Sequence, residues 1–574
     1  MVVIVLLVLA VTVSAAGLLF IGFAVGRGPR IAGNSTLLLE IGGDLPENEP
    51  AGVFGQLFDA QATVRGTVDA LRKAAVDPRV SSVIIRPTGT APLWGKVQEI
   101  RGAILEFKKS RKPIVAFMEF GGDQTYYLAS ACDKVFLLPT ASLDLTGIAN
   151  YEVFLRGSLD KIGALPDAIH VGDYKTASNT FTEHTFTPAH REMATALNRD
   201  LYDQLVRGIA ESRHKTDAEV RTLIDHGPYL PEDAVRASLI DDLAYEDEVD
   251  DKVQLGRGRV NTLRQHDYRN VSLASLGLNR GPRIAVIYAV GIIATGQSSY
   301  DSPSGQVLGS DTMVEYLRKA RADDSIRAIV LRIDSPGGSA IASDVMWREI
   351  MLTRDKKPVI ASMSDVAASG GYYIAMPANA IVAQPSTLTG SIGVVLLRFV
   401  VDGTLKKLGI NIETVKQGAY ADIFSPVRPF SPDERKRLGE LMQATYDTFV
   451  EKAAAGRKTT PERIDGIAQG RVWTGKQAKD LGLVDELGGL DRALQLAKSH
   501  AKIAPESDVE VVVFPPKKSF FEVVADPLRR TDSSAALAAL VGDPNARALG
   551  AVTAPLRLFR RNEPLALMPH VFVQ

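Results

Sequence analysis

Two glycine-rich turns in the second half of the chain place a serine where it could act as a nucleophile. The stretch RIDSPGGSA turns at Gly337 and Gly338 as it leaves a predicted strand, and AASGGYYIA leaves the next strand and enters a predicted helix just after Ser369. Because glycine has no Cβ, backbone N–H groups at such turns can approach a developing oxyanion, and a helix N-terminus adds a favourable positive partial charge. Each turn alone is typical of an ordinary strand-to-helix connection, but the two in succession fit a serine nucleophile that faces an oxyanion hole.

A serine nucleophile needs a base, and the usual base is a histidine with an acid behind it. The chain has eight histidines, none of them in a recognisable triad signature, and AASGG lacks the leading glycine of the G-x-S-x-G elbow. A neutral lysine is the alternative base. Keeping a lysine neutral near pH 7 costs about 4 to 5 kcal/mol, so it has to be desolvated in an apolar site. His184 and His190 are the histidines to reconsider if no lysine serves.

The elements that position these residues come from an internal duplication with a period of about 245 residues. Short β-branched runs bounded by turn residues recur in the same order in both halves and predict buried strands. They cover residues 35–43, 81–87, 112–119 and 133–140 in the first half, and residues 282–291, 327–334, 357–364 and 379–386 in the second. Helical stretches lie between them, so the fold class is α/β with largely parallel pairing.

Comparing the two halves identifies one lysine. Lys175 in GDYKTA aligns with Ala421, so the lysine is present only in the first half, whereas Ser369 aligns with Asp123, so the serine is present only in the second. Two copies that each lack a different part of one site suggest a single composite site formed between the halves. We therefore expect the Lys175 amine to lie within hydrogen-bond reach of the Ser369 hydroxyl.

The duplication also sets the expected domain boundaries. No charged side chain occurs from Val2 to Val25, a span long enough for a transmembrane helix. The length of the span and its lack of a basic start favour an uncleaved anchor over a cleaved signal peptide, although the stretch VSAAG resembles a cleavage site. We expect this anchor over residues 1–30, the first repeat with the lysine over 31–256, a linker over 257–281, the second repeat with the serine over 282–512, and a tail of unassigned role over 513–574.

Four motifs, RIDSPGGS, ASGGYYIA, PSTLTGSIGV and GDYKTA, resemble those of the long form of signal peptide peptidase. This is a membrane-anchored bacterial Ser/Lys protease family of the crotonase/Clp protease superfamily, and the likeness covers nearly the whole chain. The resemblance implies that Ser369 is the nucleophile and Lys175 the general base, and that the Ser391 hydroxyl bonds the lysine and helps hold it neutral. It also implies that the backbone N–H groups of Gly337 and Gly370 form the oxyanion hole.

The same resemblance carries expectations about substrate, assembly and location. It implies two tandem crotonase/Clp-like repeats, a dome-shaped homotetramer, and cleavage of remnant signal peptides and other apolar segments through an acyl-enzyme. It further implies a single-pass protein of the bacterial inner membrane with its catalytic region outside the cytoplasm. Arg27 and Arg30, taken alone, would place that region inside the cytoplasm instead.

Composition excludes several other classes of protein. Lysine plus arginine (66) nearly balances aspartate plus glutamate (67), so no basic field suggests nucleic acid. The only cysteine, Cys132, excludes an internal disulfide. No metal or dinucleotide motif is present, and GRVWTGKQ ends in glutamine where a phosphate-binding loop needs a hydroxyl, so Thr474 is expected to be an ordinary helix N-cap. The chemistry should need neither metal nor cofactor.

Two other functions are compatible with parts of this pattern. A crotonase-type enzyme acting on acyl-CoA would use the same glycine turns but would not require Lys175. A non-catalytic membrane scaffold would use the duplicated domains only to assemble, and would have no reason to keep the serine and the lysine in complementary halves.

Overall fold

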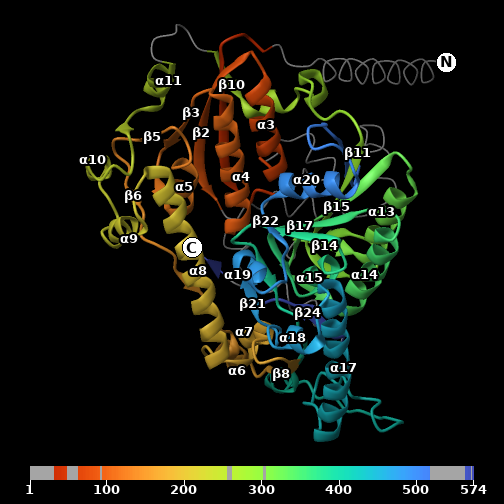
Figure 1. Ribbon diagram of the computed structural model, residues 1–574. Coiled ribbons are helices and arrows are strands. Elements are labelled where there is room, and N and C mark those ends of the chain that lie inside the picture. The colour runs from red at the N-terminus through yellow and green to blue at the C-terminus, as the bar shows by residue number, and fades with distance from the viewer. Residues whose placement is uncertain are drawn as a thin grey trace, which may run out of the picture.

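The computed structural model describes residues 31–47, 62–90, 93–254, 261–301, 305–516, 563–569 and 572–573. The predicted anchor, residues 1–30, lies outside these ranges. Within them, no helix has both the length and the apolar character that a membrane crossing requires. The two halves lie side by side, each built around its own parallel sheet (Figure 1).

The first half contains a six-stranded sheet in which every neighbouring pair is parallel. Its order is β10 (Asn261–Arg264), β1 (Ser35–Gly43), β2 (Val80–Thr90), β3 (Ile114–Met118), β5 (Lys134–Leu137) and β9 (Asp242–Leu243). Strand β10 lies in the stretch expected as a linker and extends this sheet beyond β1.

The second half contains an eight-stranded sheet whose main path is β21 (Val472–Thr474), β19 (Leu388–Gly390), β17 (Val359–Ala368), β15 (Ile326–Ser335), β11 (Arg283–Val290) and β23 (Glu510–Phe514). Strand β18 (Ala380–Ala383) also pairs with β17, and on its other side it pairs with β22 (Glu486–Leu487). Only the β19–β21 pair is antiparallel among these strands of the described chain. The predicted α/β class with largely parallel pairing is therefore confirmed.

Helices cover the sheets and bury an apolar core in each half. In the first half they include α3 (Val64–Val76), α4 (Trp94–Phe107), α5 (Asp123–Ala129), α6 (Arg156–Ile162), α8 (Pro188–Arg213), α9 (Asp217–Asp225), α10 (Pro231–Arg236) and α11 (Glu246–Gln254). In the second half they include α13 (Ser310–Ala322), α14 (Ala340–Arg354), α15 (Gly370–Ala375), α16 (Asp402–Lys407), α17 (Pro432–Arg457), α19 (Gly475–Asp480) and α20 (Leu490–His500).

The duplication seen in the sequence is also present in the structure. Helices α8 and α17 each have 26 residues, begin with proline at the first turn, and are capped by a hydroxyl side chain. The Tyr126 hydroxyl donates to the Leu239 carbonyl in the first half (2.6 Å), and the Tyr372 hydroxyl donates to the Leu483 carbonyl in the second (3.1 Å). The two halves are therefore built to one plan, down to individual buried contacts.

A third sheet joins the halves. Its order is β13 (Ser299–Asp301), β14 (Gly305–Gly309), β12 (Ile292–Ala294), β16 (Gly337–Ser339), β24 (Leu565–Leu567), β20 (Val394–Val400) and β8 (Leu165–Val171). Strand β8 belongs to the first half and pairs antiparallel with β20 of the second over seven residues. This pairing brings the segment that carries the lysine to the turns that carry the serine.

A buried cluster of charged side chains also connects the halves. The Arg332 guanidinium donates to Glu47 (2.7 Å) and Glu99 (2.6 Å), and its side chain is fully buried. Beside it, Lys96 of α4 pairs with Asp334 (2.8 Å), the residue directly before the Ser335 turn. Removing one member of such a cluster leaves a buried charge without a partner, so the cluster fixes how the two halves meet.

Candidate active site

The structure brings Lys175 and Ser369 together, although 194 positions separate them in the sequence. The Lys175 Nζ lies 2.7 Å from the Ser369 Oγ, inside the range expected from the repeat comparison. Both side chains are buried, with 1% and 0% of their surface exposed. Lys175 follows β8 and precedes a short 3₁₀ turn, and Ser369 stands between β17 and α15.

The Ser369 backbone has an unusual conformation, with φ 54° and ψ −111°. Non-glycine residues rarely adopt it, and such strain costs roughly 1–3 kcal/mol. Two backbone hydrogen bonds hold it: the Ser369 N–H donates to the Gly390 carbonyl, and the Tyr373 N–H donates to the Ser369 carbonyl, both at 2.8 Å. The sharp turn between strand and helix thus directs the hydroxyl at the lysine instead of into the sheet.

Three oxygen atoms surround the lysine amine. Besides Ser369 Oγ, these are the Ser391 carbonyl oxygen at 2.9 Å and the Ser391 Oγ at 3.0 Å. A neutral amine has two N–H donors and one lone pair. In an unprotonated lysine the two contacts to Ser391 would use both donors and leave the lone pair for the Ser369 hydroxyl to donate to. This set of partners suits an unprotonated lysine that accepts the serine proton.

Burial is also the reason for the shifted titration of this lysine. Removal of the amine from water lowers the pKa of Lys175 well below its ordinary value, because the charged form loses its hydration. A lysine of this kind can act as a base close to neutral pH, as the sequence argument required.

Gly470 is a site residue that the sequence argument missed. It has φ +78°, and a Cβ at this position would lie 2.5 Å from the Lys175 Cα. Only glycine lets the two backbones approach so closely. Gly470 is the first residue of GRVWTGKQ, the stretch that resembles a phosphate-binding loop. The structure confirms the other expectation about this stretch, since the Thr474 side chain caps α19 and accepts from the Gln477 N–H (3.1 Å).

Gly337 and Gly370 lie beside each other next to Ser369. Gly337 has φ +99°, and a Cβ built there would lie 2.7 Å from the Gly370 nitrogen. The Gly337 N–H donates to the Ser335 Oγ at 3.2 Å, a long contact to a neutral acceptor. An oxyanion formed beside Ser369 would be a stronger acceptor for the Gly337 N–H than the neutral Ser335 hydroxyl.

The histidines considered as alternative bases contact other residues. His190 is buried in α8 with its Nε2 2.8 Å from Glu152, and the largely exposed His184 lies 3.5 Å from Asp160. The first-half counterpart of the serine, Asp123, accepts from the Gly147 N–H (3.0 Å), and burial raises its pKa to about 6.

Asp365, four residues before Ser369, connects the site to the first half. Its carboxylate accepts from the backbone N–H groups of Leu93 (3.0 Å) and Lys96 (2.7 Å) at the start of α4. Burial raises the pKa of Asp365 to about 7, although the Lys96 charge opposes that shift. Strand β17, which ends at the turn that carries Ser369, is therefore hydrogen-bonded to the half that contains Lys175.

A protein-family model described as Peptidase family S49 matches residues 106–258 and 351–504, just over half of the chain, with one segment in each half. The chain belongs to peptidase family S49. This membership makes it a serine protease and confirms the predicted relationship to signal peptide peptidases.

Proteases of one plant and two bacteria are similar to this chain over most of its length. The "Serine protease SPPA, chloroplastic" of Arabidopsis thaliana is 40% identical over 77% of this chain and 66% of its own length. "Protease 4" of Salmonella typhi is 34% identical over 81% of this chain and 78% of its own, and "Protease 4" of Haemophilus influenzae is 29% identical over 82% and 79%.

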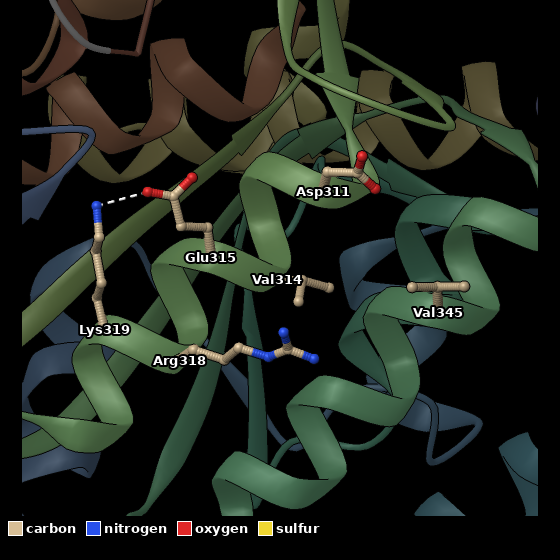
Figure 2. A pocket seen from close by; sticks show the side chains of 6 residues that line it. All are labelled: Asp311, Val314, Glu315, Arg318, Lys319 and Val345. Carbon is tan, nitrogen blue, oxygen red and sulfur yellow. Dashed lines mark hydrogen bonds and ion pairs between the residues drawn. The ribbon is translucent and has the colours of Figure 1, made fainter.

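A surface pocket elsewhere on this S49 peptidase contributes nothing to the site. It lies between α13 and α14 and is lined by Asp311, Val314, Glu315, Arg318, Lys319 and Val345 (Figure 2). Two of its charged groups already pair with each other, since the Lys319 amine donates to Glu315 at 2.6 Å. Across the described ranges, no group of three or more histidine, cysteine or acidic side chains is arranged to hold a metal ion.

Proposed function

We propose that this chain is an endopeptidase with a Ser/Lys dyad, in which Ser369 is the nucleophile and Lys175 the general base. One observation carries the proposal: the buried Lys175 Nζ lies 2.7 Å from the Ser369 Oγ. An acyl-CoA enzyme would have no use for this contact, and a scaffold would have no reason to bury an amine against a strained serine.

The proposed reaction follows the usual order for a serine peptidase. The Lys175 amine takes the hydroxyl proton while Ser369 Oγ attacks the peptide carbonyl, and the N–H groups of Gly337 and Gly370 stabilise the resulting oxyanion. The protonated lysine then gives its proton to the leaving amine, which departs and leaves an acyl-enzyme ester on Ser369. A water molecule loses a proton to Lys175 and attacks the ester. The Ser369 oxygen then leaves and takes that proton back from Lys175, which releases the acid product and restores the free serine and the neutral lysine.

Apolar side chains near both residues of the dyad support an apolar peptide as substrate. One cluster beside the lysine includes Ala177, Phe181, Val395 and Leu397. Another includes Ala368, the residue before the nucleophile, together with Met193, Leu197, Val366, Leu388 and Val472. An apolar environment of this kind around Lys175 and Ser369 suits the remnant signal peptides and other apolar segments implied by the motifs.

Covalent labelling tests the dyad. A fluorophosphonate probe, which reacts with activated serines, should label the full chain at Ser369 as mapped by mass spectrometry. Labelling should disappear in Ser369→Ala and persist in Ser386→Ala, which removes another buried hydroxyl, one that bonds Gln98 instead of the lysine. Labelling at a different residue, or equal labelling of the Ser369→Ala chain, would contradict the assignment.

We further propose that each half has the crotonase/Clp protease fold and that residues 1–30 anchor the protein in the bacterial inner membrane, with the catalytic region outside the cytoplasm. The parallel sheets with glycine turns support the first statement, and the uncharged run from Val2 to Val25 supports the second. Cell fractionation tests the anchor by comparing the full chain with a chain that starts at residue 31. The full chain should be found in the membrane fraction and the shorter chain should not. Equal distribution of the two chains would exclude the anchor.

The internal repeat supports a homotetramer through two segments that do not pair with each other within one chain, although Asn150 and Tyr151 of one segment pair on one edge with Phe572 and Val573. Strand β8 of the first half pairs with β20 of the second. Their counterparts, residues 411–417 and residues 148–154, make no such pair with each other within the described chain. Residues 411–420 are all exposed, and Val415 has 97% of its surface accessible. We propose that residues 411–417 pair with residues 148–154 of the next copy, which closes a ring.

The register of the existing pair specifies a cross-link that tests this interface. Ala168 lies opposite Leu397 in the β8–β20 pair. In the repeat, Thr414 corresponds to Ala168 and Tyr151 corresponds to Leu397. The proposed interface therefore places Thr414 of one copy opposite Tyr151 of the next. Both positions are exposed, and Cys132 is buried, so background oxidation should be low. A Tyr151→Cys/Thr414→Cys chain should form a disulfide ladder up to the tetramer. Neither single-cysteine variant should form this ladder. A double variant that stays a monomer would rule out this interface.

A further inference from the structure

The two strands that lead to the active-site turns lose their regular pairing just before those turns. The register of β15 and β17 shifts at Asp334, which alone faces the three residues 364–366 of β17. The extra residues form a bulge, and a bulge changes the direction of the chain that follows it. From this point β15 continues to the turn at Gly337 and β17 continues to Ser369. The bulge therefore lies where it can set the direction of both turns.

Side chains hold the two strands together at the bulge. The Val366 N–H donates to the Asp334 carboxylate at 3.2 Å. The Lys96 amine lies 2.8 Å from the Asp334 carboxylate and 3.8 Å from the Asp365 carboxylate, so one positive charge joins a carboxylate on each strand. Lys96 belongs to α4 of the first half. The connection between the two second-half strands therefore depends on a residue of the other half.

The start of α4 fits closely against the bulge. The Asp365 carboxylate accepts from the N–H groups of Leu93 and Lys96 at this end of the helix. A Cβ at Gly95 would lie 2.8 Å from the Ser364 carbonyl oxygen, so a glycine is needed for the helix to come this near. In Figure 1, α4 reaches the second-half sheet beside β17. The backbone of α4 thus fixes the position from which the buried Lys96 side chain extends.

The repeat comparison finds this lysine only in the half that also supplies Lys175. Lys96 is the third residue of α4, and the third residue of α14, the corresponding helix of the second half, is Ala342. The alignment used for the dyad places Asp365 opposite Glu119, which is partly exposed and pairs with an arginine of its own half. The lysine bridge is therefore a composite of the two halves, as the dyad is.

We infer that Lys96 is a positioning residue for the peptidase reaction: by joining Asp334 to Asp365, it sets the distance between the Gly337 N–H and the Ser369 Oγ. The inference rests on the proposed function, because the groups that it positions belong to the proposed oxyanion hole and dyad. Lys96 acts through the two strands and not by contact with the reacting atoms. A small error in this distance is costly, since a misplacement of about 1 Å can lower a rate by about 10²-fold.

Lys96→Met tests this inference in the full chain. Methionine is also long and unbranched but carries no charge, so Asp334 and Asp365 would face each other without a cation and the bulge should open. We expect kcat for a small apolar peptide ester to fall about tenfold to 10²-fold while KM changes little. An apolar peptide aldehyde forms a hemiacetal with a nucleophilic serine and places its oxygen in the oxyanion hole. Its Ki should rise by the same factor as kcat falls.

The aldehyde and a second variant separate positioning from folding. A variant that is only less stable has fewer folded molecules and a lower apparent kcat, but each folded molecule binds the aldehyde with the wild-type Ki. Lys96→Met/Asp334→Asn removes one carboxylate together with the cation, so its stability in urea should recover toward that of the wild type. Its kcat and Ki should remain impaired, because no charge joins the two strands.

Lys112→Met is the matched control, since it makes the same change at a first-half lysine whose amine donates to the carbonyls of Ala74 (2.7 Å) and Asp77 (2.6 Å). It should keep the wild-type kcat, KM and Ki. A wild-type Ki in Lys96→Met, or a kcat that recovers with stability in the double variant, would overturn the positioning role and leave the dyad standing. If the aldehyde binds wild-type and Ser369→Ala chains equally, the proposed function fails and this inference fails with it.

Discussion

Replacing Lys175 with arginine should reduce kcat/KM on a small apolar peptide ester by about 10³-fold or more, as fully as Lys175→Ala. Arginine keeps a positive charge but stays protonated at all accessible pH values, so it has no lone pair for the Ser369 proton. Burial should reduce the activity of Lys175→Arg further, because a permanent charge would replace an amine whose pKa is lowered by burial. Steady-state kinetics on the folded variants, with folding checked by circular dichroism, measures the effect.

Lys73→Arg is the matched control for this prediction. Lys73 is also buried in the first half, with 4% of its surface exposed, but its amine donates to the carbonyl oxygens of Tyr268 (2.9 Å) and Val271 (3.1 Å) far from the dyad. This variant should keep most of the wild-type activity. A Lys175→Arg chain with more than about a tenth of wild-type kcat/KM would mean that the lysine is structural.

Gly337→Ala should lower kcat by about 10²- to 10³-fold, the usual range for loss of one oxyanion donor. The residue has φ +99°, which an alanine rarely adopts, and the added Cβ would lie 2.7 Å from the Gly370 nitrogen. Either the turn rotates away or the Cβ occupies the space where the oxyanion forms. The same Cβ would meet the Ala566 carbonyl at 2.0 Å, so the tail should lose its place as well. Kinetics on the peptide ester separates the kcat loss from any change in KM.

Gly439→Ala is the control for a methyl group added at glycine. Gly439 lies in α17 with nothing within 4 Å of its added Cβ, so alanine should leave kcat unchanged and stabilise the helix slightly. If Gly337→Ala retains more than about a third of wild-type kcat, the Gly337 N–H is not an oxyanion donor.

The sequence predicted the α/β class and the partners in the dyad for different physical reasons. Parallel strands leave a clear signal because they are buried on both faces and appear as apolar runs. The meeting of Lys175 with Ser369 had no local signal, and it was predicted only because the duplication supplied an internal comparison in which each half lacks one residue. Without the Ala421 and Asp123 counterparts, Lys175 would have been one surface lysine among many.

The features that sequence reasoning did not reach depend on contacts between distant segments. Gly470 allows the approach of Lys175, but its role follows from a backbone distance that no spacing encodes. The Arg332 cluster joins residues from Glu47 to Ser364, and the charged side chains of such a cluster look like ordinary surface residues in sequence. Strand β24 has only three residues, too few for a period-2 pattern to stand out.

The pH dependence of kcat/KM tests the central claim, that a neutral Lys175 activates Ser369, most directly. Because the base must be unprotonated in the free enzyme, kcat/KM for the peptide ester should rise with pH through the lowered lysine pKa and then level off. The midpoint should lie well below the ordinary lysine value of 10.5, and the residual activity of Lys175→Arg should lack this rising limb. A midpoint at the ordinary lysine value, or the same rising limb in Lys175→Arg, would contradict the account.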